Sequence, residues 1–77
     1  MEQARTYRIS LKKEPEGGYT VTVPSLPGCI TYGENIDEAI SMAEEAISLY
    51  IEELQSRGEV IIDDNNTLEY SIQLKTA

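Results

Sequence analysis

The sequence predicts a single α+β domain in which one long helix covers one face of a short antiparallel sheet. Two patterns carry this prediction: apolar residues recur at every second position in residues 6–13, 19–23 and 68–74, and at spacings of three and four across residues 36–57. A chain of 77 residues has enough apolar surface for one core and not for two. We therefore expect residues 1–77 to form one domain.

The first two predicted strands, residues 6–13 and 19–23, form a hairpin. Between them, Pro15 has a preset φ, and Gly17 and Gly18 accept the positive φ of a tight turn. Apolar side chains alternate with polar ones on both sides of the turn, which is the period of half-buried strands. The apolar positions are Tyr7, Ile9, Leu11, Tyr19, Val21 and Val23.

A third short strand is predicted at residues 29–32, after a loop that contains two prolines. Pro24 and Pro27 each lack the backbone N–H that a sheet ladder needs, so they end the second strand and bracket a turn. The sheet then continues through Cys29 to Tyr32.

The helix is predicted over residues 36–57. Asn35 is placed to cap its N-terminus, and Glu38 stands three residues later in a capping-box position. Arg57 lies in the last turn, and Gly58 can take the left-handed conformation that ends a helix. The apolar stripe consists of Ile36, Ala39, Ile40, Ala43, Ala46, Ile47, Tyr50, Ile51 and Leu54.

After the helix come a short apolar segment, residues 60–62, a loop at residues 63–66 and a last strand at residues 68–74. The predicted order is therefore β-β-β-α-β. The loop sequence Asp-Asp-Asn-Asn resembles the start of a calcium loop but lacks its glycine and its glutamate, so a solvated loop is predicted. Opposite the helix, the sheet presents a polar face to solvent or to a partner, formed by Arg8, Ser10, Lys12, Thr20 and Thr22.

The composition favours a binding protein over an enzyme. With no histidine and one cysteine, the chain cannot build the usual nucleophile-base pairs or a zinc site, and Cys29 is interpreted as a small buried hydrophobe. Glu34, Asp37 and Glu38 form a carboxylate cluster of the kind that holds magnesium in nucleases, but a helix cap already explains them. We predict no catalytic residue, cofactor or metal.

The formal charge of −8 disfavours direct binding to nucleic acid or to an anionic membrane. It fits either a basic protein partner or simply high solubility. The N-terminus lacks the pattern of a secretion signal, and no apolar run is long enough to cross a bilayer, so a cytoplasmic protein is expected.

Residues 17–34, GGYTVTVPSLPGCITYGE, followed by DEAI at residues 37–40, resemble the HicB family of antitoxins. The resemblance implies a partial ribonuclease H arrangement without that enzyme's catalytic carboxylates, and dimers or higher homo-oligomers. It implies that the chain inhibits a HicA-like toxin, a small basic ribonuclease that cleaves mRNA. Many members also carry a DNA-binding domain for autoregulation; after Gly58 we expect no room for one, so autorepression by this chain is not expected.

Within this resemblance, the candidate toxin-binding residues fall in three places: the proline loop, the junction between the third strand and the helix, and the outer helix face. They are Pro24, Leu26, Pro27, Tyr32, Glu34, Glu45 and Glu52. The alternative from another functional class is a homo-oligomeric structural or regulatory module without a cognate toxin, in which a sheet edge or the polar face pairs with a second copy.

Overall fold

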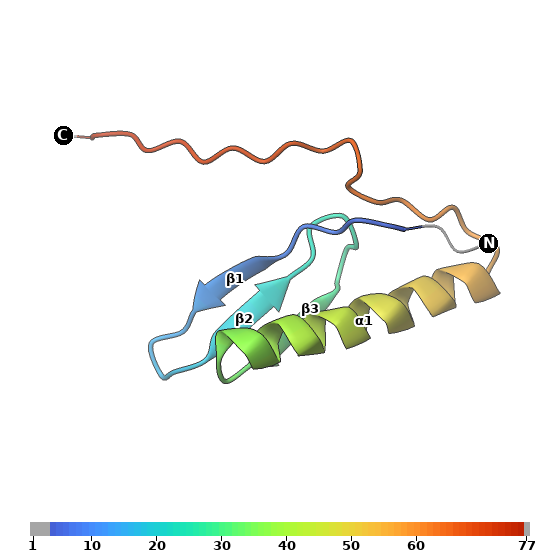
Figure 1. Ribbon diagram of the computed structural model, residues 1–77, viewed down its shortest axis with the longest axis horizontal. Coiled ribbons are helices and arrows are strands. Elements are labelled where there is room, and N and C mark those ends of the chain that lie inside the picture. Colours follow the sequence, from blue (N-terminus) through green and yellow to red (C-terminus); the bar gives the residue numbers. More distant parts are fainter. Residues whose placement is uncertain (1–3, 77) are drawn as a thin grey trace.

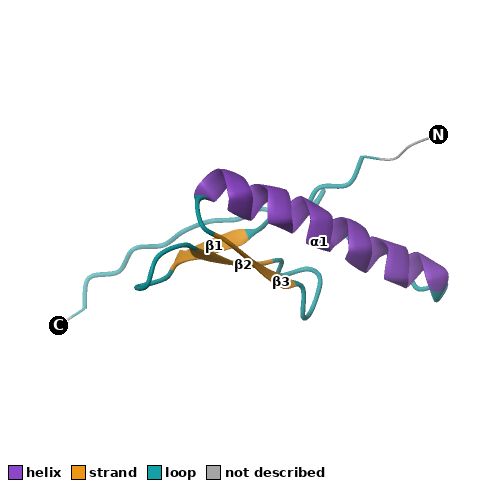
Figure 2. Ribbon diagram, turned by 90° about the horizontal axis from the view of Figure 1, so that it is seen from below, coloured by secondary structure: helices purple, strands orange, loops and turns teal. Residues whose placement is uncertain are grey.

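The computed structural model describes residues 4–76 and has two layers. Three strands, β1 (Ser10–Lys13), β2 (Tyr19–Thr22) and β3 (Ile30–Gly33), form an antiparallel sheet in the order β1-β2-β3. Helix α1 (Ile36–Ser56) follows and lies across one face of that sheet (Figures 1 and 2). The predicted α+β fold, with a single helix over an antiparallel sheet, is confirmed.

The three strands lie close to their predicted positions, but β1 and β2 are shorter than predicted and β3 begins one residue later. Leu11 is opposite Val21, and Val21 is opposite Thr31, so the register places apolar residues on the helix side. Residues 6–9, predicted to belong to the first strand, precede the ladder. The reason is that β2 ends at Thr22 and is soon followed by Pro24, which has no N–H to donate.

The helix begins and ends close to the predicted positions. The Asn35 side chain accepts a hydrogen bond from the Glu38 backbone N–H at 2.8 Å, and the Glu38 carboxylate accepts one from the Glu34 N–H at 3.0 Å. At the other end Arg57 is the C-cap residue, and Gly58 takes a φ of 67°. The carboxylates that could have held magnesium in a nuclease, those of Glu34, Asp37 and Glu38, are thus part of the helix cap or lie next to it.

The core consists of two adjoining clusters between the sheet and the helix. One contains Val21, Ala39 and Ala43, and the other contains Val23, Leu26 and Cys29. The small alanines let α1 lie close to the strands. Half-buried side chains complete the clusters: Tyr7, Ile9, Leu11, Tyr19, Ala46, Ile47, Tyr50 and Leu54.

The predicted last strand is the main difference. Within residues 4–76, the structure contains no fourth strand: residues 68–76 are extended chain that leaves the two layers (Figure 1). The apolar positions of this segment are between 75% and 94% exposed: Leu68, Tyr70, Ile72 and Leu74. Alternation predicted the extended backbone correctly, but a strand also needs a neighbour, and this chain supplies none.

The loop before that segment corrects a second prediction. The Asp64 side chain is only 4% exposed, so residues 63–66 are not simply a solvated loop. Its carboxylate accepts hydrogen bonds from the Arg8 N–H at 2.8 Å and from the Ser25 hydroxyl, and its own N–H donates to the Thr6 carbonyl at 2.7 Å. Asp64 therefore fastens the chain beyond the helix to the start of the sheet.

Candidate functional site

The proline loop between β2 and β3 is held by its own backbone. The Leu26 N–H donates to the Val23 carbonyl at 3.0 Å, and the Cys29 N–H donates to the Leu26 carbonyl at 2.9 Å. The Leu26 side chain is 2% exposed and fills the core, whereas Pro24 and Pro27 face outward. Of the three predicted loop residues, the two prolines are thus available to a partner, and Leu26 holds the loop in shape.

The loop rests against the C-terminal half of α1. The Tyr50 hydroxyl donates to the Pro27 carbonyl at 2.8 Å. A shallow pocket beside this contact is lined by what we call the helix-end patch: Pro27, Leu54, Val60 and Ile62. Val60 and Ile62 are exposed and were not among the predicted binding residues. The apolar run at residues 60–62 was the signal for them, but periodicity did not show where it would lie.

Tyr32 and Glu34 lie at the other end of the helix. The Tyr32 side chain is 47% exposed, packs beside Gly18, and donates a hydrogen bond to the Gly17 carbonyl at 3.0 Å. Glu34 is exposed next to the helix cap. Because α1 rises about 1.5 Å per residue, Glu34 and the Tyr50–Pro27 contact are separated by roughly 20 Å. The structure therefore does not gather the predicted residues into one compact site.

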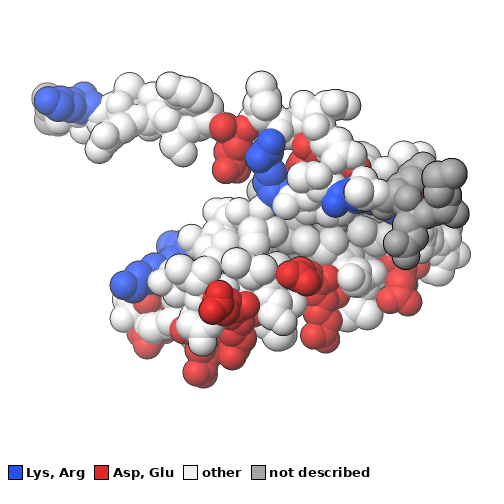
Figure 3. Space-filling view, in the orientation of Figure 1, with Lys and Arg blue, Asp and Glu red and all other residues white. Residues whose placement is uncertain are grey.

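Glu45 and Glu52 lie two helical turns apart and point away from the buried alanines, in the middle of an acidic surface. Figure 3 shows carboxylates gathered along the helix side of the molecule. We call this surface the acidic helix face; its six carboxylates belong to Asp37, Glu38, Glu44, Glu45, Glu52 and Glu53. No lysine or arginine occurs within α1, and Arg57 at its C-cap pairs with one of the six, Glu53, at 3.5 Å.

The basic residues gather elsewhere. Four of the six in the chain fall within residues 5–13, at and before β1: Arg5, Arg8, Lys12 and Lys13. The net charge of −8 is therefore unevenly distributed, with a strongly acidic helix on one side and a locally basic strand on the other. Such an arrangement orients a charged partner before contact, because the potential differs between the two sides.

Two buried groups have shifted pKa values for simple reasons. Hydrogen bonds from the Arg8 N–H and the Ser25 hydroxyl lower the pKa of Asp64. Burial raises the pKa of the Cys29 thiol, which keeps it protonated at neutral pH. Cys29 is 6% exposed, and its interpretation as a small core hydrophobe is confirmed.

Within residues 4–76 no three His, Cys, Asp or Glu side chains converge closely enough to hold a metal ion. Over the same residues, no helix has the length and apolar character needed to span a membrane. The described surface combines an acidic helix face with the helix-end patch at one end and Tyr32 at the other.

Comparison with known proteins gives a consistent result. A family model described as the HicB-like antitoxin of bacterial toxin-antitoxin systems matches residues 7–75. A UPF0150 protein of Thermoplasma acidophilum is 44% identical over 59 residues, which cover 77% of this chain and 86% of the relative. A UPF0150 protein of Synechocystis is 45% identical over 53 residues, covering 69% and 67%. The antitoxin HicB of Escherichia coli is 39% identical over 41 residues, covering 53% of this chain and 30% of that antitoxin.

Proposed function

Because the chain belongs to the HicB-like antitoxin family of bacterial toxin-antitoxin systems, we propose that it binds a HicA-type toxin and blocks mRNA cleavage by direct contact. The observation that carries the proposal beyond family membership is the acidic helix face, whose six carboxylates stand without a single basic residue on the same element. A basic ribonuclease has the complementary sign.

The size of the surface also supports this proposal. A helix of 21 residues is about 30 Å long, which is close to the diameter of a small protein domain. One small toxin lying along α1 would therefore reach the proline loop at one end and Tyr32 with Glu34 at the other. Pro24 and Pro27 would supply rigid apolar contact, while Glu45 and Glu52 would meet cations near the centre. Leu26 would act only by supporting the loop.

The proposed activity is inhibition by binding, so the chain itself acts without catalysis and without a cofactor. Its place of action is the cytoplasm, because that is where an mRNA-cleaving toxin finds its substrate. Direct contact with nucleic acid plays no part in the proposal, since the acidic helix face would repel phosphates.

The proposal predicts that a small basic protein is encoded beside this chain, and coexpression of the two tests it. We expect the neighbour to stop growth when expressed alone, and this chain to restore growth and to copurify with it. A harmless neighbour, or a toxic one that this chain neither binds nor rescues, would sink the proposal.

A matched pair of variants locates the contact. Glu52→Lys on the acidic helix face should weaken toxin binding by at least about threefold, because it places a cation opposite cations. Glu69→Lys makes the same charge change on the exposed extended segment after Thr67, which runs away from α1 (Figure 1), and should bind almost as the unmodified chain does. Equal losses in the two variants would show that net charge matters and the helix face does not.

The second candidate is a homo-oligomeric structural or regulatory module. The exposed apolar residues after Thr67 favour it, because such a segment gains stability only when another surface covers it. Sedimentation of the full chain decides whether copies associate, and a strict monomer at high concentration would remove this candidate.

A further inference from the structure

The chain exposes more surface than a folded monomer of its size should. Its accessible area is 6406 Å², whereas a compact monomer of 8.6 kDa exposes about 4700 Å². Its radius of gyration is 14.6 Å, against about 11.5 Å for a compact chain of this length. The excess, about 1700 Å² for one chain, is about twice the area that each partner buries in a standard protein interface.

Much of this excess lies in the segment that follows Thr67, which we call the C-terminal arm (residues 68–75). Figures 1 and 2 show it running away from the sheet and helix. Its apolar side chains share one side, which is the pattern of a strand with a core to cover. Tyr70 is 86% exposed and Leu68 is 94% exposed, so the apolar side of the arm is not covered within the described residues of one copy.

The outer edge of β1 is open to another strand. The Glu14 N–H donates to the Gly18 carbonyl at 3.0 Å, so Glu14 bonds toward β2. In an antiparallel pair every second residue bonds to the same neighbour, so the N–H and C=O groups of Lys12 and Ser10 also point toward β2. Ile9, Leu11 and Lys13 consequently turn their N–H and C=O groups outward. An edge of this kind accepts a strand from another chain.

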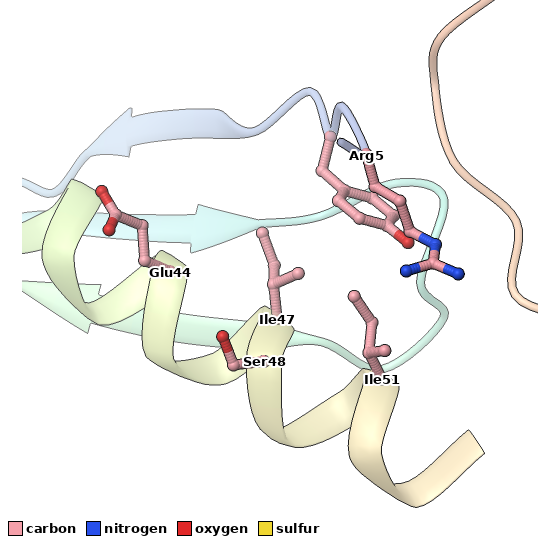
Figure 4. Close-up of a pocket in the computed structure, with 6 residues that line it drawn as sticks. Arg5, Glu44, Ile47, Ser48 and Ile51 are labelled. Carbon is pink, nitrogen blue, oxygen red and sulfur yellow. The ribbon is translucent and has the colours of Figure 1, made fainter. Parts of the chain in front are cut away.

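The helix side of this edge is also incompletely covered. A groove of about 430 Å³ lies between α1 and the chain leading into β1, and Tyr7, Ile47 and Ile51 line it. Figure 4 shows Ile47 and Ile51 pointing from the helix into that space. By helical spacing Ile36 and Ile40 lie along the same side of α1, and both are exposed. A fourth strand beside β1 would cover this row of isoleucines.

The arm of the same copy runs on the β1 side of the sheet, but it stays apart from β1 and forms no ladder with it (Figure 1). Asp64 bonds both to Arg8 and to Ser25, so the anchor ties the chain beyond the helix to the chain entering β1 and to the loop after β2. The Arg8 guanidinium also donates to the Thr67 carbonyl at 3.0 Å, which fixes the start of the arm. These bonds hold only the start of the arm, and within residues 4–76 no later residue of the arm pairs with the β1 edge of the same copy.

We propose that the C-terminal arm forms the fourth strand on the β1 edge of a second copy, and that the two copies exchange arms. The dimensions agree: eight residues span about 26 Å as a strand, and residues 7–13 offer an edge of about 23 Å. Charge agrees as well. The arm carries one acidic and one basic residue, and it meets the most basic part of the chain, so the acidic helix faces need not approach each other.

The first test uses two neighbouring substitutions that change the charge equally. Ile72→Glu places a carboxylate on the apolar side of the arm, and Gln73→Glu places one on its polar side. Sedimentation equilibrium of the full chain should show a dimer, with a dissociation constant raised by about tenfold or more in Ile72→Glu and little changed in Gln73→Glu. Ile72 is exposed in the single copy, so this substitution does not threaten folding.

A monomeric unmodified chain, or equal effects of the two substitutions, would overturn the proposal. The inference develops the self-association proposed above, and its measurements use this chain alone. A negative result therefore leaves toxin inhibition to be judged by the coexpression experiment.

Crosslinking then identifies the surface that receives the arm. In a Cys29→Ala background, one chain carries Lys12→Cys and a second, size-tagged chain carries Ser71→Cys, and the two are refolded together with a short thiol-reactive bifunctional reagent. A product joining the two differently sized chains is expected. Products formed only between two arms would overturn the proposal. So would crosslinks confined to single chains when both cysteines are placed in one polypeptide.

Discussion

Gly33 is the residue at which the sheet and the helix come closest. A Cβ at this position would overlap the backbone nitrogen and the Cα of Ala39, and backbone atoms cannot move aside as a flexible side chain can. The close contact places the start of α1 directly over β3 and leaves the β1 side of the sheet less covered. One missing side chain thus decides where the helix lies.

We predict that Gly33→Ala lowers the free energy of unfolding by about 1–3 kcal/mol, or more if α1 must shift. Gly17→Ala is the control, because Gly17 has a φ of 107° but open space around it, so only backbone strain of about 1 kcal/mol is expected. Urea unfolding compares the two variants. A Gly33→Ala variant no less stable than Gly17→Ala would contradict the close packing.

Asp64 gives the second prediction at this scale, which concerns pH. Because its folded-state pKa is below the ordinary value of 3.8, its hydrogen bonds contribute stability that is complete above that value and is lost as the pH falls through it toward the folded pKa. We expect Asp64→Asn to be less stable than the unmodified chain at neutral pH, with the difference shrinking on acidification.

The measurement is the urea midpoint of both chains from about pH 6 to about pH 3. Comparing the chains removes the general effect of neutralising a protein of net charge −8. Asp63→Asn serves as control, because the Asp63 carboxylate bonds only locally, to Asn65. A difference between Asp64→Asn and the unmodified chain that stays constant with pH would show that the anchor does not depend on ionisation.

Among the elements, α1 is the one whose limits local chemistry sets most clearly. The Asn35 side chain satisfies the Glu38 N–H, and Glu38 in turn satisfies the Glu34 N–H, so the cap leaves fewer unpaired donors at the helix start. Asp37 and Glu38 also lie at the positive end of the helix dipole. The helix start depends on these contacts as well as on packing.

Asn35→Ala should therefore cost about 1 kcal/mol of stability. Asn66→Ala removes the same kind of side-chain amide from an exposed loop position. It should change the unfolding free energy by no more than about 0.5 kcal/mol. Thermal unfolding followed by helical circular dichroism distinguishes the variants. Similar melting temperatures would mean that packing alone holds the first turn.

At the scale of the whole molecule, the charge distribution predicts how a basic toxin associates. Long-range attraction between an acidic helix face and a cationic partner accelerates encounter and is screened by salt. We expect the association rate with a bound toxin to fall by about tenfold or more between low and high ionic strength, while the dissociation rate changes less. Stopped-flow mixing measures both, and a salt-independent association rate would exclude electrostatic steering.

The sequence by itself determined the features that neighbouring residues decide. Alternation located the first two strands, a short β-prone run after the proline loop located the third, the three-and-four spacing and Asn35 located α1, and residues 17–40 indicated the family. Each of these signals lies within a few residues or one helix, where backbone geometry links spacing directly to structure.

Only the tertiary structure decided what lies next to what. Leu26 is in the core although its loop looked exposed, Asp64 is buried although its neighbours are polar, and the predicted binding residues are spread along the length of α1. The C-terminal arm makes the same point. A period of two fixes which side of a strand is apolar, but the partner that completes the strand depends on chain path, and beyond the anchor at Asp64 that path stays apart from the edge of its own sheet.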